Sequence, residues 1–398
     1  MLSIKSYPAR NGDAYLLKED GPVRTAILVD GGYPATFHEH IRADLVELAR
    51  QGYDLDLVVA THIDADHISG LLAFFKANGA AGAPKIIPVR RVFHNSLRSL
   101  CQMASPTQTV QLADQELLAE IQRGGFPAPS ADINHEGEIS ARQGSSLAVL
   151  LQSGGYRWNE GNGQAAIDEE SLSQNAIGGG NLIVLGPPHV RLEKLLSAWT
   201  DDIRQLGFSG PLDANNRLDD AFEFLSAERA ADAPGHIISG RTLAMDLKDC
   251  YSPDDSVTNG SSIAFVFETE GGRVLFLGDG WSEDAETSLR KLGDSARPML
   301  FDAIKISHHG SLRNTSPALL DLVDAPRYFI SSNGEGHGHP DFAVLAAIVD
   351  RPGPNRELFF NYPTPASARL KTHVSKAGAK FFVREGFADW VPLEGQSV

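Results

Sequence analysis

The stretch T-H-I-D-A-D-H, residues 61–67, places two histidines and two aspartates within six positions. It follows the apolar run L-D-L-V-V-A and precedes I-S-G-L-L-A-F-F, whose apolar spacing predicts a helix that begins near Asp66. A strand, a ligand-rich loop and a helix thus follow one another, and α/β proteins place their chemistry at such carboxyl ends of strands. The first candidate metal ligands are therefore His62, Asp64, Asp66 and His67.

Length and composition limit the class of protein. A chain of 398 residues suffices for one large or two modest domains. A net charge of −16 argues against broad adhesion to nucleic acid or to an acidic membrane, although two cations in a cleft would reverse the sign locally. No apolar run approaches the roughly 18 residues of a membrane span, and the first residues do not read as a secretory signal. Since Cys101 and Cys250 are too few for a disulfide framework, we expect a cytoplasmic protein without membrane contact.

Short strands and helices alternate along the rest of the chain. A helix is predicted over residues 38–51, and S-S-I-A-F-V-F-E with R-V-L-F-L-G-D predicts a hairpin that ends on Asp279. The strand D-A-I-K-I-S precedes H-H-G-S, and R-Y-F-I-S-S precedes N-G-E-G-H-G-H-P. This order predicts an α/β fold, an αββα sandwich, over residues 1–398. Residues 100–180 and 200–255 are expected to be insertions that form a lid or a partner surface.

Further candidate ligands follow later strands, where strand ends of a sandwich converge on one edge. They are Asp279, the pair His308 and His309, and the pair His337 and His339. Histidine and aspartate suit zinc, manganese or iron, and a shared carboxylate can bridge two cations. Two metals about 3.5–4 Å apart can hold a hydroxide for attack on phosphorus or a carbonyl. Such a site needs no serine or cysteine nucleophile.

The motifs together resemble a known family. T-H-I-D-A-D-H is similar to the H-x-H-x-D-H signature of the metallo-β-lactamase superfamily, and V-L-F-L-G-D to its later strand that ends on a bridging aspartate. K-I-S-H-H-G-S, G-H-P, G-D-A-Y-L-L and N-G-S-S-I-A-F-V-F-E resemble, more narrowly, the hydrolase domain of ComEC-type competence proteins. The resemblance covers roughly residues 1–95 and 180–345.

The resemblance implies a role for each matching residue. His62 and Asp64 would serve the first metal, Asp66 and His67 the second, Asp279 would bridge both, and His339 would be the last ligand of the second site. His308 or His309 would be a ligand or the general acid that protonates the leaving oxygen, and with Asp66 they form the predicted catalytic set. Either His189 or His94 would complete the first site, and His94 is also a candidate substrate contact.

Asp64 departs from the commonest pattern, which has an imidazole at that position. A carboxylate adds negative charge and is a harder donor, so it shifts preference from zinc toward manganese, iron or magnesium. We therefore expect two divalent ions, Mn²⁺ or Zn²⁺, with Mg²⁺ or Fe²⁺ as alternatives. Asp64 and Asp66 also suit the start of a helix, where aspartate is a common capping residue. Lys305 and Ser311 are candidate contacts for a phosphate, although a lysine in a strand and a serine in a turn need no special role.

Three functions fit these residues. The first is a phosphodiesterase or nuclease that acts on DNA or RNA, with a nucleic acid or nucleotide as substrate and Arg90, Arg91 and Arg98 as a clamp for phosphate. The same arginines also suit a solvated strand edge. The second is a hydrolase of a small substrate, such as a cyclic nucleotide, thioester or lactam, which fits the acidic composition better. The third is a non-catalytic regulatory module, and the oligomeric state stays open.

Overall fold

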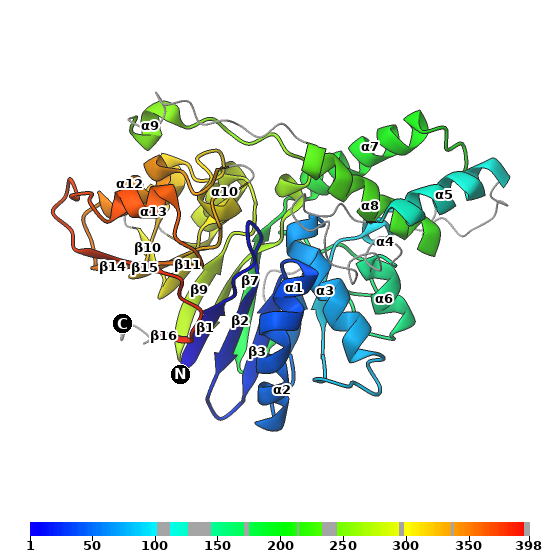
Figure 1. The fold of residues 1–398 in the computed structure, drawn as a ribbon, viewed down its shortest axis with the longest axis horizontal. Coiled ribbons are helices and arrows are strands. Elements are labelled where there is room, and N and C mark those ends of the chain that lie inside the picture. Colours follow the sequence, from blue (N-terminus) through cyan, green and yellow to red (C-terminus); the bar gives the residue numbers. More distant parts are fainter. Residues whose placement is uncertain are drawn as a thin grey trace.

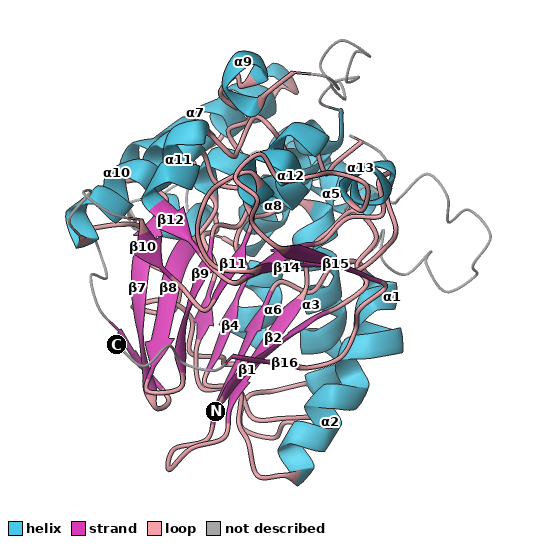
Figure 2. Cartoon of the chain, turned by 90° about the vertical axis from the view of Figure 1, so that its left-hand side faces the viewer, coloured by secondary structure: helices cyan, strands magenta, loops and turns pink. Residues whose placement is uncertain are grey.

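In the described part of the chain, two mixed β-sheets pack face to face, and helices cover the outer face of each sheet (Figures 1 and 2). The predicted αββα sandwich is therefore confirmed. The computed structural model describes residues 1–101, 112–125, 145–170, 175–212, 215–232, 245–293, 298–335 and 338–393.

The first sheet has the strand order β16-β1-β2-β3-β4-β5. Its side chains alternate between the two faces: in β3, Ala26 and Leu28 face the outer helices, whereas Ile27 and Val29 face the second sheet. Strands β3, β4 and β5 run parallel, so their carboxyl ends meet at one edge. The strands are β1 (Leu2–Ser6), β2 (Tyr15–Glu19), β3 (Thr25–Val29), β4 (Leu57–Val59), β5 (Val92–Phe93) and β16 (Val391–Leu393).

The second sheet has the strand order β15-β14-β13-β11-β9-β8-β7-β6. The predicted hairpin is present as β8 and β9, and β9, β11, β13, β14 and β15 run parallel. A short parallel pair, β10 with β12, lies outside this sheet. The strands are β6 (Asn175–Ile177), β7 (Gly180–Gly186), β8 (Ala264–Thr269), β9 (Gly272–Phe276), β10 (Met299–Leu300), β11 (Ala303–Lys305), β12 (Val323–Asp324), β13 (Arg327–Ile330), β14 (Arg356–Phe360) and β15 (Phe381–Glu385).

The core between the sheets is apolar and rich in aromatic rings. Tyr15 of the first sheet lies edge-on to Phe276 of the second, with ring centroids 5.6 Å apart, and Phe276 stacks on Phe265 at 5.1 Å. Aromatic pairs in these geometries add about 0.5–1.5 kcal/mol each beyond the burial of their area. This packing fixes the two sheets relative to each other, and with them the loops at the strand ends.

Helix α3 begins within the ligand-rich loop and packs closely on the end of β3. A Cβ on Gly70 of this helix would lie 1.9 Å from the carbonyl oxygen of Gly31, so this contact requires glycine at position 70. The helix predicted over residues 38–51 is present and begins earlier, through a π-helical turn, η1. The elements that cover the first sheet are α1 (Pro34–Thr36), η1 (Phe37–Ile41), α2 (Arg42–Arg50), α3 (Ala65–Asn78) and α6 (Leu147–Ser153).

A second helical layer covers the other sheet and shares an apolar core with it. Its helices alternate with the parallel strands of that sheet, as in other α/β proteins. The layer consists of α9 (Leu247–Cys250), α10 (Ser282–Leu292), α11 (Pro317–Leu322), α12 (Phe342–Val349) and α13 (Pro365–Leu370), with the 3₁₀ turns η4 (Asn259–Ser261) and η5 (Ser307–Gly310) in the connecting loops.

Helices α5 and α8 of the predicted insertions form a separate apolar cluster with α4 and α7, whereas α6 and α9 pack on the two sheets (Figure 1). Trp199 and Phe222 pack edge to face in it, with ring centroids 5.5 Å apart. Large parts of residues 100–180 and 200–255 lie outside the described residues, so the lid remains a prediction. The cluster is built from α4 (Leu97–Leu100), α5 (Leu112–Gly124), α7 (His189–Gln205) and α8 (Asn216–Asp232).

No described helix combines the length and the apolar character that crossing a membrane requires.

Candidate metal centre

The candidate ligands come together at the carboxyl ends of parallel strands from both sheets. Asp30 follows β3, the ligand-rich loop follows β4, Asp279 follows β9, and His308 and His309 follow β11. The loop between β1 and β2 reaches the same place: a Cβ on Gly12 would lie 1.9 Å from the carbonyl oxygen at position 66, so only glycine fits. Five loops thus meet at the edge of the sandwich and present their polar side chains to one another.

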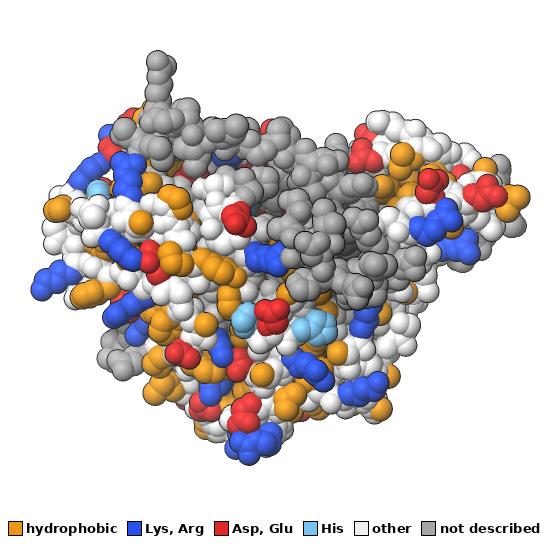
Figure 3. All heavy atoms as spheres, viewed as in Figure 1, with side chains coloured by type: hydrophobic (Ala, Val, Ile, Leu, Met, Phe, Trp, Pro, Cys, Tyr) orange, Lys and Arg blue, Asp and Glu red, His pale blue; other side chains and the backbone are white. Residues whose placement is uncertain are grey.

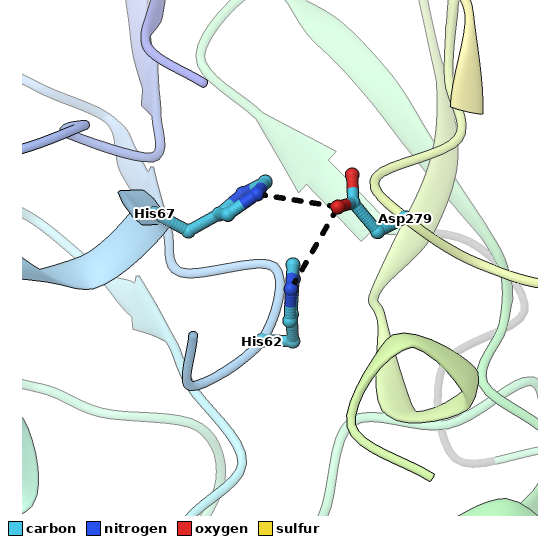
Figure 4. A group of neighbouring side chains, drawn as sticks. All are labelled: His62, His67 and Asp279. Carbon is cyan, nitrogen blue, oxygen red and sulfur yellow. Dashed lines mark ion pairs between the residues drawn. The ribbon is translucent and has the colours of Figure 1, made fainter. Parts of the chain in front are cut away.

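His62, His67 and Asp279 form the centre of the cluster (Figure 4). The imidazoles point toward the carboxylate, with His67 Nε2 3.4 Å and His62 Nε2 4.0 Å from Asp279 Oδ2. All three residues are buried, and neither Nε2 atom has a hydrogen-bond partner among the described residues. Buried polar atoms are rarely left without a partner, so these two nitrogens and the oxygen between them fit a cation.

Hydrogen bonds to Asp30 and Thr61 set which ring nitrogen of His67 and of His62 carries the proton. Asp30 Oδ2 lies 2.9 Å from His67 Nδ1, and a carboxylate can only accept, so His67 donates through Nδ1–H. The Thr61 hydroxyl donates to the same carboxylate at 2.7 Å and therefore accepts from His62 Nδ1–H at 3.1 Å. In the neutral form, which a metal requires, both histidines thus direct the lone pair of Nε2 at the centre of the cluster. This is the arrangement of metal-binding histidines whose second nitrogen is held by an outer group.

A second group of ligand atoms adjoins the first and shares His67. Asp66, His67 and His309 offer ligand atoms that all lie within 4.8 Å of one another. His309 Nε2 is 3.8 Å from Asp66 Oδ2 and 3.5 Å from Asp279 Oδ2. The amide of Asn11 donates to Asp66 Oδ2 at 3.0 Å and holds that carboxylate in place. The donors therefore suit a pair of neighbouring cations rather than a single one.

Asp64 lies beside the first group. Its backbone occupies the cap position of α3, but its carboxylate makes no capping hydrogen bond. Instead its Oδ2 is 3.4 Å from His62 Nε2. The interpretation of Asp64 as a simple helix cap is therefore not supported, and its position fits a ligand.

A buried ion pair closes the other side of the cluster. Asp13 and Lys305 are each 1% exposed and form an ion pair with each other. Burial alone would raise the pKa of Asp13, but Lys305 and His309 outweigh it and lower this pKa to about 2. Burial would also raise the pKa of Asp279, and His67, His309 and Lys305 hold that pKa well below its usual range. Both carboxylates are therefore ionised.

His308 and His309 have left-handed backbones, with φ of 45° and 54°. Such conformations cost about 1–3 kcal/mol each for residues with a side chain and recur at functional sites. The amide of Asn314 donates through Nδ2 to Asp254 Oδ2 and to the Asp279 carbonyl, each at 3.0 Å, so its Oδ1 is the acceptor for His308 Nδ1–H at 2.8 Å. His308 Nε2 is left facing Asp279 Oδ2 at 3.9 Å.

His339 lies at the rim of the cluster. Its ring is 5.0 Å from the ring of His308, and its Nδ1 is 3.3 Å from Asp341 Oδ2. Burial lowers the pKa of His339 to about 4, so the imidazole is neutral at pH 7. His339 belongs to none of the ligand groups formed by the described residues, and its role as the last ligand remains a prediction. Its predicted companion, His337, lies outside the described residues.

The structure does not bring His94 or His189 into the cluster. His94 is fully buried and lies 2.8 Å from Glu223, a carboxylate that also caps the start of α6. It therefore joins the first sheet to the insertion. The side chain of His189 is 58% exposed and pairs with Asp168 at 3.0 Å. Neither histidine belongs to a ligand group of the described residues, so neither geometry supports a ligand that completes the first site.

The three predicted arginines each pair with carboxylates. Arg90 contacts Asp54 at 2.9 Å and Asp56 at 3.5 Å. Arg91 pairs with Glu160, and Arg98 with Asp219. On the face shown in Figure 3, basic and acidic side chains are interspersed and no broad basic surface appears. Each arginine is thus already paired with a carboxylate, and the clamp for phosphate, with Arg91 as a substrate contact, remains a prediction.

Sequence reasoning missed four residues of the site: Asp13, Asp30, Lys305 and Asn314. Asp30 had a usable signal, since it ends the apolar strand T-A-I-L-V-D at the same edge as the ligand loop. Lys305 had another, because a lone charge within the apolar run A-I-K-I, three residues before the first of two adjacent histidines, is unusual for a buried strand. Asp13 and Asn314 lie in loops, where a polar residue needs no explanation.

Comparison with known proteins supports the fold. Residues 7–97, which include the ligand-rich loop, match the sequence profile of the metallo-beta-lactamase superfamily. The two mixed sheets flanked by helices have that superfamily's type of fold. Among curated proteins, none matches the sequence significantly.

Two solved structures show a weak likeness to the whole chain. One is a mutant of the CmlA beta-hydroxylase (14% identity, TM-score 0.37) and the other is CmlA, a diiron beta-hydroxylase from Streptomyces venezuelae (12% identity, TM-score 0.36). Each alignment covers 98% of this chain, which spans about half, 54%, of the other protein. At these TM-scores the likeness carries no weight for function.

Proposed function

We propose that the protein is a metal-dependent hydrolase of phosphodiesters that acts on DNA or RNA. The observation that carries the proposal is the pair of buried Nε2 atoms of His62 and His67, which share no hydrogen bond with any described residue and face one oxygen of Asp279. Outer hydrogen bonds fix both lone pairs in that direction. Nitrogen and carboxylate donors of this kind suit Mn²⁺, Zn²⁺ or Fe²⁺.

The first two ligand groups share His67, and Asp64 lies beside the first. We assign His62 and Asp64 to one ion and Asp66, His67 and His309 to the other, with Asp279 shared between them. When bound, a pair of divalent ions supplies an activated water and neutralises charge on the attacked phosphorus. We assign His309 as a ligand because its Nε2 lies within the second group.

His308 is the better candidate for the general acid. It belongs to no ligand group of the described residues, and its side chain is 19% exposed against 6% for His309. Asn314 Oδ1 accepts a hydrogen bond from His308 Nδ1–H and so fixes the ring with Nε2 toward the centre. In the imidazolium form this Nε2 would donate its proton to the leaving oxygen.

The nature of the substrate rests on weaker support. The motifs K-I-S-H-H-G-S and G-H-P resemble those of ComEC-type hydrolase domains, which favours DNA or RNA. The pairing of Arg90, Arg91 and Arg98 with carboxylates favours the second candidate, a hydrolase of a small substrate such as a cyclic nucleotide. A polymer needs a basic track along which its phosphates lie, whereas a small ester needs only the metal centre.

Activity assays separate the two candidates. The purified protein is incubated with single-stranded DNA, RNA and a panel of cyclic nucleotides, in the presence of Mn²⁺ or Zn²⁺. We expect cleavage that Asp279→Asn abolishes, since an amide is a poor bridging ligand. His189→Ala is the matched control, because this histidine lies on the surface away from the ligand groups. Turnover of small substrates alone selects the second candidate, and metal binding without any turnover refutes both.

A further inference from the structure

Lys305 is a buried cation that the proposed reaction does not use. It is the last residue of β11, between Ile304 and Ile306, whose side chains pack under the outer helices. Its ammonium group therefore points the other way, into the metal centre. There it pairs with Asp13, donates to the Gly278 carbonyl at 2.8 Å and lies 3.4 Å from Asp279 Oδ1. An ammonium group has three donors, and all three have a partner here.

The contact with Lys305 distinguishes the two oxygens of Asp279. Oδ1 lies 3.4 Å from the ammonium group. Oδ2 faces the imidazoles, at 3.4 Å from His67, 3.5 Å from His309, 3.9 Å from His308 and 4.0 Å from His62. The carboxylate therefore presents one oxygen to the cluster and the other to Lys305.

We propose that Lys305 is a positioning residue: it holds Asp279 Oδ1, so that Oδ2 faces the residues that would hold the two divalent cations. The inference rests on the proposed metal centre and not on the identity of the substrate. Without Lys305, the carboxylate would be free to turn, and we expect bound cations to be held more weakly and to interact differently.

Burial supports this role. Asp13 and Lys305 are each 1% exposed and Asp279 is 2% exposed, so bulk water does not compete for these charges. A buried ammonium group and its carboxylates hold one another in place, because a buried charge without a partner is costly.

The simpler interpretation is that Lys305 serves only as the partner of Asp13. A set of variants separates the two roles. Lys305→Met leaves Asp13 buried without its cation and can prevent folding, so the decisive variant is the double substitution Lys305→Met with Asp13→Asn. It removes a positive and a negative charge together and keeps the shapes, and replacing both members of a buried ion pair is often tolerated. Asp13→Asn alone is the matched control, because it keeps Lys305 beside Asp279.

The readout is binding of Co²⁺ to protein freed of metal with a chelator. Titration calorimetry gives the stoichiometry and affinities, and electron paramagnetic resonance gives the magnetic coupling between two bound ions. We expect wild type and Asp13→Asn to bind two coupled ions per chain. The double variant should bind at least one ion about tenfold or more weakly, as for other outer-shell changes, and with altered coupling.

The outcomes separate the role of Lys305, the metal centre and the proposed function. A double variant that matches wild type in affinity and coupling overturns the role of Lys305, as does an equal loss in Asp13→Asn alone. Wild type that binds no Co²⁺ refutes the metal centre, and this inference with it. Two coupled ions without any hydrolysis would refute the proposed function and leave the role of Lys305 standing.

Discussion

Ile63 separates two proposed ligands of the first cation, and its side chain points away from them. It is 1% exposed and belongs to the apolar cluster of the insertion helices, with residues such as Trp199 and Phe222. The loop that carries His62 and Asp64 is therefore anchored by the insertion rather than by the sandwich alone. This predicts that packing in the insertion controls how well the loop holds a metal.

The change Ile63→Ala tests this coupling. It removes three buried carbon atoms, worth about 0.8 kcal/mol each in transfer free energy, and leaves a cavity that costs more. We expect the free energy of unfolding of the metal-free protein to fall by about 3–4 kcal/mol. Because the loop loses its anchor, affinity for Mn²⁺ should also fall, by about tenfold. Urea denaturation in chelator and titration calorimetry measure the two effects separately.

The matched control is Leu218→Ala. Leu218 is fully buried in the same cluster but lies on α8, outside the ligand loop. Its truncation should reduce stability by a similar amount, within the 2–5 kcal/mol usual for such changes, and leave the affinity for Mn²⁺ unchanged. If Ile63→Ala lost stability but bound Mn²⁺ as wild type does, the anchoring argument would be refuted. Equal losses of affinity in both variants would point instead to a general loosening of the fold.

Three further changes have defined outcomes. Asp30→Asn weakens the acceptor for His67 Nδ1–H, so calorimetry should show metal affinity reduced about 10–100-fold; unchanged affinity would count against the proposed ligand. Asn314→Ala should leave the metal content unchanged but lower kcat about tenfold or more, because the ring of His308 loses the partner that orients it. Loss of metal from this variant would instead indicate that His308 is a ligand. Burial raises the pKa of Asp220 to about 6, so the folded state binds this proton more tightly than the unfolded state does. The free energy of unfolding should therefore fall as the pH rises from about 4 to about 6. In Asp220→Asn, urea titrations at several pH values should show a smaller change of the free energy of unfolding between about pH 4 and about pH 6. The same change as in wild type would refute the role of Asp220.

The layers of the fold could be predicted because they depend on local periodicity. Strand β3 is a short continuous apolar run, as expected for a strand that is buried on both faces, and α3 has apolar residues at helical spacing directly after the ligand loop. The order of such elements then allows few arrangements. The helix boundaries were less predictable: the helix expected to start at residue 38 begins at Pro34, because a π-helical turn extends it backward.

The ligand loop could also be predicted, since its residues are adjacent in the sequence. The residues around the ligands could not be predicted, because their partners are distant in the sequence. Lys305 has a role only because Asp13, from the opposite end of the chain, lies beside it. His94 looked like a ligand near a strand end, but its partner Glu223 comes from the insertion. A sequence shows which residues can bind a metal, and the folded chain decides which of them are already engaged.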